Sequence, residues 1–223
     1  MSTPFVAVSG TENRTTYAAA GVAGGKAVSF DNDYIGNTNA REQAADDPDL
    51  RGLTDFTVEC WTYQTKYCAS GDATIVGAFM NWKIYQESAG AVRFRWMKSD
   101  GTTSFSAKLS PSALNEWTHS ALVRNFTDES TANNTIYLNG GSAITQTEYD
   151  AEATGTGAEV THSLGTADGK YTFPGSIDEV RVSTVARSAD WVKASHDTVT
   201  ESSFATYGSA RENVDKGMII ILR

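Results

Sequence analysis

Short runs in which mostly apolar residues alternate with mostly polar ones recur along most of this chain. Examples are Phe56–Trp61, Val92–Trp96 and Trp117–Arg124. In the second run Arg93 and Arg95 share one face, and the apolar residues share the other. Successive side chains of a β-strand point to opposite sides, so this period of two predicts strands.

Turn and cap residues separate the runs. Asn139-Gly140 lies between Thr135–Leu138 and Ser142–Thr145, the strongest short signal for a β-hairpin. One helix is predicted, in which Ser188 caps the segment Ala189–Ala194. Many short strands with a single helix favour an all-β sandwich in one domain.

Five of these segments occur in an order that resembles a known family. They are Ala27–Ile35, Phe56–Trp61, Trp117–Arg124, Ile136–Gly140 and Gly175–Val182. Together they resemble the laminin-G-like domains of the concanavalin A-like lectin/glucanase superfamily. The resemblance implies a jelly-roll β-sandwich of two antiparallel sheets with one short helix near the C-terminus. The family domain ends near residue 208, which divides the chain into a domain over residues 1–208 and a tail over residues 209–223. The tail has no counterpart in the family, and its apolar run predicts an extra strand or an assembly segment.

Charge narrows the classes of function. The 223 residues carry a formal net charge of -9, with 27 acidic and 18 basic side chains. Nucleic-acid binding needs clustered Lys and Arg, so we do not expect it. The N-terminus does not have the pattern of a secretory signal, and no apolar run is long enough to insert into a membrane. We expect the protein to act in an extracellular setting, at a cell surface or on a virion.

The two cysteines, Cys60 and Cys68, leave two alternatives open. Cys60 shares a strand face with Phe56 and Val58, which favours a small buried apolar side chain. A disulfide between the two cysteines is the second alternative.

A calcium site is implied by the resemblance. Many members of the family hold a structural calcium where an early turn and a late strand lie close together. The matching residues here are Asp31, Asp33 and Asp178. Calcium takes six to eight oxygen ligands, which carboxylates supply. The alternative is that Asp31 and Asp33 belong to an ordinary turn.

A glycan-binding surface is the second predicted site. Sugars present apolar faces beside hydroxyl groups, so exposed aromatic rings next to polar side chains bind them. The aromatic residues predicted to lie on or near one sheet face are Tyr67, Trp82, Tyr85 and Trp96. For any one of these tryptophans the alternative is packing in the core.

A glycosidase site is the third candidate site and the least favoured of the three. Glu148, Asp150 and Glu152 alternate, and on one strand their carboxylates would share a face. Retaining glycosidases use two carboxyl groups ~5 Å apart. The segment runs into a loop-like stretch after Glu152, which argues against a catalytic strand.

These patterns favour a non-catalytic carbohydrate-binding or adhesion module, with calcium as a structural ion. Its expected partner is a glycan or cell-surface polysaccharide. The alternative is a structural or decoration protein of a virion or cell surface layer, which would self-associate through the apolar run Gly217–Leu222. Tests of binding and of assembly distinguish the two.

Overall fold

The computed structural model describes residues 6–7, 15–30, 42–44, 48–68, 72–78, 81–88, 90–98, 100, 102–111, 113–155, 162–166, 172–201 and 204. Asp31, Asp33 and the tail over 209–223 lie outside these residues, so the predictions made for them stay predictions. No helix in the described part of the chain is long and apolar enough to cross a bilayer.

The described residues form strands, one α-helix and one short 3-10 helix. In chain order these are β1 (Val6–Ala7), β2 (Thr15–Ala20), β3 (Lys26–Phe30), β4 (Glu42–Ala44), η1 (Pro48–Leu50), β5 (Phe56–Gln64), β6 (Asp72–Ala78), β7 (Trp82–Glu87), β8 (Ala91–Met97), β9 (Thr103–Pro111), β10 (Trp117–Asp128), β11 (Thr131–Leu138), β12 (Gly141–Tyr149), β13 (His162–Leu164), β14 (Gly175–Ser183) and α1 (Ala189–Thr200).

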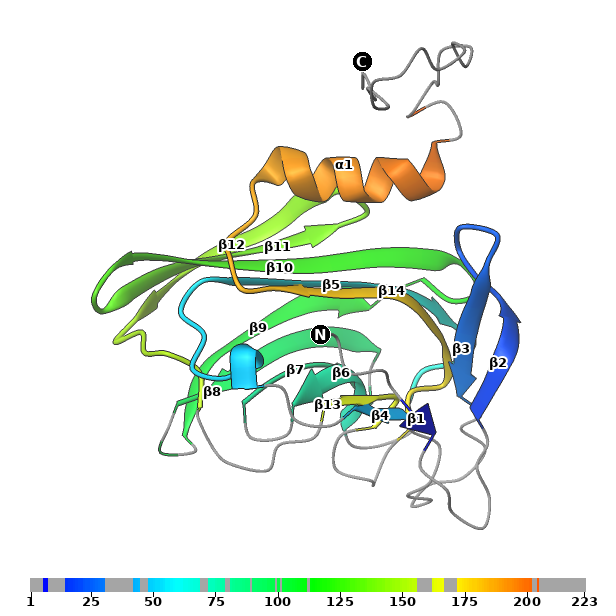
Figure 1. The fold of residues 1–223 in the computed structure, drawn as a ribbon, viewed down its shortest axis with the longest axis horizontal. Helices are drawn as coiled ribbons and strands as arrows, with labels where there is room; N and C mark the ends of the chain where they lie inside the picture. Colours follow the sequence, from blue (N-terminus) through cyan, green and yellow to red (C-terminus); the bar gives the residue numbers. More distant parts are fainter. Residues whose placement is uncertain are drawn as a thin grey trace, which may run out of the picture.

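The described strands form two sheets of seven. Sheet 1 has the order β1-β4-β13-β6-β7-β8-β9, and sheet 2 has the order β12-β11-β10-β5-β14-β3-β2. Paired neighbours run antiparallel in both. Figure 1 shows the two sheets stacked, with α1 lying on the outer face of sheet 2. The predicted all-β sandwich with one helix near the C-terminus is confirmed.

Strand β5 shows how the helix changes burial. Phe56, Val58 and Cys60 point into the core between the sheets. Glu59 and Trp61 point the other way, yet they are 1% and 2% exposed. They are buried because α1 covers this face of sheet 2, so the side chains alternate in direction along β5 but not between buried and exposed.

A second, smaller apolar cluster attaches the helix. Ala121 and Val123 of β10 and Tyr137 of β11 pack with Val192 of α1. Burial of this apolar area contributes roughly 25 cal/mol per Å². The helix is therefore part of the folded domain and not an appendage.

The predicted hairpin and helix cap are both confirmed. Asn139 and Gly140 have φ values of 48° and 74°, the left-handed pair that a type I′ turn requires, and they join β11 to β12. The Ser188 side chain accepts a hydrogen bond from the backbone N–H of Trp191 at 3.2 Å, so it caps α1.

Both cysteines are buried thiols, as the first alternative expected. Cys60 is fully enclosed in the core, and burial raises the pKa of its thiol to about 12, with a smaller contribution from the neighbouring Glu59 charge. A thiol with this pKa stays protonated and unreactive at neutral pH.

Candidate functional site

Two of the four aromatic residues predicted for a sugar platform lie in the core. Trp82 on β7 is 3% exposed and Trp96 on β8 is 1% exposed. They share the strand faces of Ile84 and Phe94, which pack between the sheets. The expectation that their rings are exposed is therefore wrong for both, because a large apolar ring gains more from this core than from solvent.

Tyr67 is the aromatic residue of the set with an exposed side chain. It follows β5 and is 39% exposed. Its ring packs over Gly90 in the turn between β7 and β8, where a Cβ atom would lie 2.4 Å from the Tyr67 Cδ1 atom. Gly90 also has a φ of 83°, so this close approach and this backbone both require glycine.

Tyr85 lies on the outer face of sheet 1, pointing away from the core. It is nevertheless only 5% exposed. The Lys83 ammonium lies 4.2 Å from the centre of its ring and the Arg95 guanidinium 5.5 Å from it. Burial, with a smaller contribution from Asp72, raises the pKa of the Tyr85 hydroxyl. The expectation of a bare ring is wrong here too, since two cations cover it.

Charged side chains surround Tyr85 on adjacent strands. The set, which we call the cationic face, consists of Asp72 on β6, Lys83, Tyr85 and Glu87 on β7, Arg93 and Arg95 on β8, and Lys108 on β9. The strand register places Lys83 opposite Arg95, and Arg93 opposite Lys108. Four cations and two carboxylates therefore share one sheet face of a protein whose net charge is -9.

Most of these charges are paired. Glu87 accepts from both Arg93 and Lys108, the latter at 3.0 Å. The hydrogen bond from Lys108, followed by that from Arg93, lowers the pKa of Glu87 despite partial burial. Lys83 pairs with Asp72 at 3.5 Å. These pairs hold the side chains in fixed positions on the strands, which reduces the entropy cost of binding a ligand.

Arg95 differs from its neighbours. Within the described residues it makes no ion pair, and its buried Nε atom has no hydrogen-bond partner. Its contact with Tyr85 is of the cation–π kind. The guanidinium group thus keeps donors that a ligand oxygen could accept from.

Asp178, the third predicted calcium ligand, lies on β14. Its two carboxylate oxygens accept backbone N–H bonds from Val22 at 3.0 Å and from Glu179 at 2.9 Å. In the described ranges no group of three or more His, Cys, Asp or Glu residues is placed to hold a metal ion. Calcium binding with Asp31 and Asp33 stays a prediction, because those two residues lie outside the described part.

Glu148, the predicted glycosidase carboxylate, is part of the core. It is 3% exposed and forms a two-pronged pair with the fully buried Arg124, at 2.8 Å and 3.0 Å. Trp96 Nε1 and Asn134 Nδ2 also donate to it, at 3.2 Å and 3.1 Å. With four donors on two oxygens, Glu148 is held as an ionised structural group.

The three alternating carboxylates do not share one strand, in line with the sequence argument against a catalytic strand. Strand β12 ends at Tyr149, and Asp150 has a φ of 53°, so the chain turns before Glu152. Glu152 is exposed and pairs with Lys98 at 3.3 Å. The hairpin from β11 ends here because a left-handed residue cannot continue the ladder.

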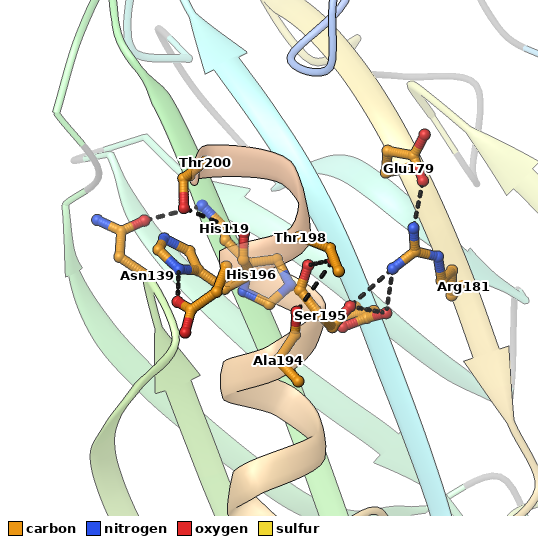
Figure 2. Close-up of polar contacts among 11 residues, drawn as sticks. His119, Asn139, Glu179, Arg181, Ala194, Ser195, His196, Thr198 and Thr200 are labelled. Atoms are coloured by element: carbon orange, nitrogen blue, oxygen red, sulfur yellow. Dashed lines mark hydrogen bonds and ion pairs between the residues drawn. The ribbon is translucent and has the colours of Figure 1, made fainter. Parts of the chain in front are cut away.

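A second polar cluster lies beneath α1 (Figure 2). Glu59 accepts hydrogen bonds from Ser195 at 2.9 Å and from Arg181 at 3.1 Å, and it contacts His119 Nε2 at 3.2 Å. We call Glu59, His119, Arg181 and Ser195 the helix clasp. His196 of α1 stacks on the Trp61 ring at 5.3 Å, above the same strands.

The helix clasp does not have the geometry of a nucleophilic triad. Ser195 donates to Glu59 and accepts from Arg181, so its hydroxyl is not bonded to His119. Burial alone would raise the pKa of Glu59, but the bonds to His119, Ser195 and Arg181 outweigh it and lower that pKa. The cluster is a charge network that joins the helix to sheet 2, in which the Arg181 side chain stays 40% exposed and the buried His119 Nδ1 has no hydrogen-bond partner among the described residues.

Sequence reasoning detected part of the cationic face and missed the helix clasp. The alternation in Val92–Trp96 correctly put Arg93 and Arg95 on one side. Lys108 carries the same signal, since it lies between Ala107 and Leu109 of an alternating run on β9, but sequence reasoning did not use it. Glu59 reads as a solvent-facing residue of its strand and becomes buried only through α1.

Solved structures with the same architecture include domains of three other proteins. The binding domain of paraclostridial mosquitocidal protein 1 gives a TM-score of 0.65 at 15% identity, covering 91% of this chain and 49% of that one. The receptor-binding domain of botulinum neurotoxin type G gives 0.60 at 12% identity, covering 87% and 46%. Domain 4 of an extracellular arabinanase from Geobacillus stearothermophilus, in complex with arabinotriose, gives 0.55 at 20% identity, covering 82% and 81%.

At these identities the likeness shows the fold alone, and the chain spans about half the length of the two toxin domains. Comparison with curated proteins gives no match. A family model described as the concanavalin A-like lectin/glucanases superfamily matches residues 24–193, which is most of the chain. The chain therefore belongs to the concanavalin A-like lectin/glucanases superfamily.

Proposed function

We propose that this chain is a non-catalytic carbohydrate-binding module and that the cationic face of sheet 1 is its ligand surface. The observation that carries the proposal is the difference in cover between the two sheets. Helix α1 lies on the outer face of sheet 2 (Figure 1), whereas on sheet 1 the side chain of Lys108 is 50% exposed and those of Arg93 and Glu87 are partly exposed, at 28% and 26%.

The chemistry of the face suits sugar hydroxyls. Each hydroxyl group both donates and accepts, so carboxylates next to cations can bind neighbouring hydroxyls. Glu87 between Arg93 and Lys108 offers such a pairing in a fixed geometry. Tyr67 adds an exposed ring at the β7–β8 end of the sheet.

The superfamily and the similar domains support this choice of ligand. The arabinanase domain is solved with arabinotriose, and the neurotoxin domain binds a receptor. A module of this kind acts outside the cell, at a cell surface or on a virion. A calcium ion bound by Asp178, Asp31 and Asp33 would stabilise the early turn of the module. Glu148 accepts four hydrogen bonds inside the core and is therefore not placed to act on a substrate, which favours a binding role over hydrolysis.

The test is a glycan array with the purified protein, in calcium and with a chelator. The double variant Lys83→Gln with Arg93→Gln should weaken each hit by roughly tenfold, as expected when two central contacts are lost. The matched control, Arg187→Gln with Lys193→Gln, removes the same two kinds of charge on the α1 side and should leave binding unchanged. An array without hits, or equal loss in both double variants, contradicts the proposal. Chelator sensitivity tests the calcium prediction separately.

A further inference from the structure

The register of β7 and β8 brings two cations together. Lys83 and Arg95 are direct cross-strand partners on the same outer face. Like charges directly opposite each other on neighbouring strands are destabilising. Lys83 has Asp72 as a counter-ion at 3.5 Å, but Arg95 has none among the described residues. Among the described residues, Asp72 is the carboxylate that forms an ion pair with this pair of cations.

Tyr85 compensates for only part of this charge. The centre of its ring lies 4.2 Å from the Lys83 ammonium and 5.5 Å from the Arg95 guanidinium. A cation–π contact attracts the cation to the ring but satisfies no hydrogen-bond donor. The guanidinium of Arg95, with a buried Nε atom that lacks a partner among the described residues, is held against the Tyr85 ring without an acceptor there.

A planar guanidinium in a fixed position is suited to a two-oxygen anion. Arginine binds carboxylate and sulfate-like groups through two parallel hydrogen bonds, which a lysine cannot do. An anion placed there would also separate the charges of Lys83 and Arg95. Because the protein as a whole is acidic at -9, the local positive charge stands against the general trend of its surface.

We propose that the ligand of this face is an acidic glycan whose carboxylate or sulfate group is bound by Arg95, with Lys83 as the second cation. This inference rests on the proposed function, since it names the class of glycan for the same face. The shared chemistry is an anionic group on a sugar. A uronic acid, a sialic acid and a sulfate ester are its three sources.

The experiment compares matched acidic and neutral probes on the full chain. The pairs are oligogalacturonate with its carboxyl-reduced form, sialyllactose with lactose, and sulfated with unsulfated N-acetyllactosamine. Titration calorimetry should show at least one acidic member binding about tenfold or more tightly than its neutral partner. Its affinity should fall as salt is raised, because screening weakens a partly exposed ion pair.

Variants assign the effect to Arg95. Arg95→Gln should abolish the preference for the acidic member, and Arg95→Lys should restore only part of it because the two-pronged bond is lost. Arg187→Gln, which removes an arginine charge on the α1 side, should keep the preference. Thermal unfolding of all three variants checks that each is folded.

The outcomes separate the two proposals. Binding of neutral and acidic members with equal affinity overturns the acidic-glycan proposal and leaves glycan binding intact. A preference that survives in Arg95→Gln overturns the assignment to Arg95. If neither member of any pair binds and the broad array is also blank, both proposals fail.

Discussion

The outer faces of the two sheets carry similar charged side chains but differ in what covers them. On sheet 2, Glu59 lies under α1 at 1% exposure, and every one of its carboxylate oxygens has a partner; one of these partners is Arg181, whose side chain stays 40% exposed. On sheet 1, Glu87 and Arg93 pair at a partly exposed surface, and Arg95 next to them has no carboxylate partner among the described residues. The covering helix thus gives Glu59 a complete set of partners, whereas the Nε donor of Arg95 on sheet 1 has no partner among the described residues.

The largest expected effect comes from the same substitution made on both faces. Glu59→Gln should lower the free energy of unfolding by about 2–3 kcal/mol, since Arg181 and His119 lose a buried charged acceptor. Glu87→Gln should cost about 0–1 kcal/mol, because its ion pairs are exposed to solvent. Urea unfolding followed by tryptophan fluorescence measures both. Equal losses at the two positions would remove the distinction between the faces.

The pH dependence of stability sharpens the same contrast. The pKa of Glu59 is lowered from its ordinary value of 4.5 in the folded protein. Its contribution is therefore complete above pH 4.5 and is lost as the pH falls through the lower folded pKa. Urea unfolding between about pH 3 and about pH 7 should show a shallower loss at low pH in Glu59→Gln than in the wild type. Parallel curves would mean that Glu59 does not carry this linkage.

Loss of the apolar attachment of the helix should have the next largest effect on stability. Val192→Ala removes two buried methyl groups from the cluster beneath α1 and should cost about 2 kcal/mol. Val185→Ala is the matched control, because Val185 is 48% exposed and its truncation should change stability little. A Val192 variant as stable as the control would indicate that α1 is not part of the cooperative unit.

Loss of the helix cap should have a smaller effect. Ser188→Ala removes the acceptor for the Trp191 N–H and should cost about 1 kcal/mol. Ser188→Asp should retain most of the stability, because aspartate also caps and its charge suits the start of a helix. Thermal unfolding compares the two variants, and equal destabilisation would argue against a capping role.

The smallest expected change is in Arg95→Gln on sheet 1. This substitution removes a cation that lacks an ion pair among the described residues and faces Lys83, so stability should change by about 0.5 kcal/mol or less, in either direction. A large loss in thermal unfolding would mean that Arg95 supports the fold and is not held ready for a ligand.

Local patterns predicted the elements well and their surroundings less well. The alternation at Phe56–Trp61 and the Asn139-Gly140 turn both correspond to observed structure. The same alternation could not say which face of β7 is inside, since Trp82 and Tyr85 both bear aromatic rings on opposite sides. Burial of Trp82 depends on sheet 2, which no local pattern contains.

The candidate site, too, was predicted from local patterns in part and depended on tertiary packing for the rest. That Arg93 and Arg95 share a face was readable from spacing, because side chains alternate along any strand. That Lys83 faces Arg95 depends on the register of the hairpin through Gly90. The spacing of Glu148 and Glu152 made Glu148 a candidate catalytic carboxylate, and only its contact with Arg124 explains its burial.

The sequence by itself determined the hairpin at Asn139-Gly140 and the cap at Ser188, because these rest on interactions between near neighbours in the chain. It also determined the strands, through alternation along each run, and the superfamily, through the order of five short segments. The tertiary structure alone decided which charges are closed and which are open. Glu59 meets Arg181 and Ser195 across 122 and 136 residues. Contacts at such separations form only when the sheets and α1 pack together, so the covered face and the open face cannot be told apart before folding.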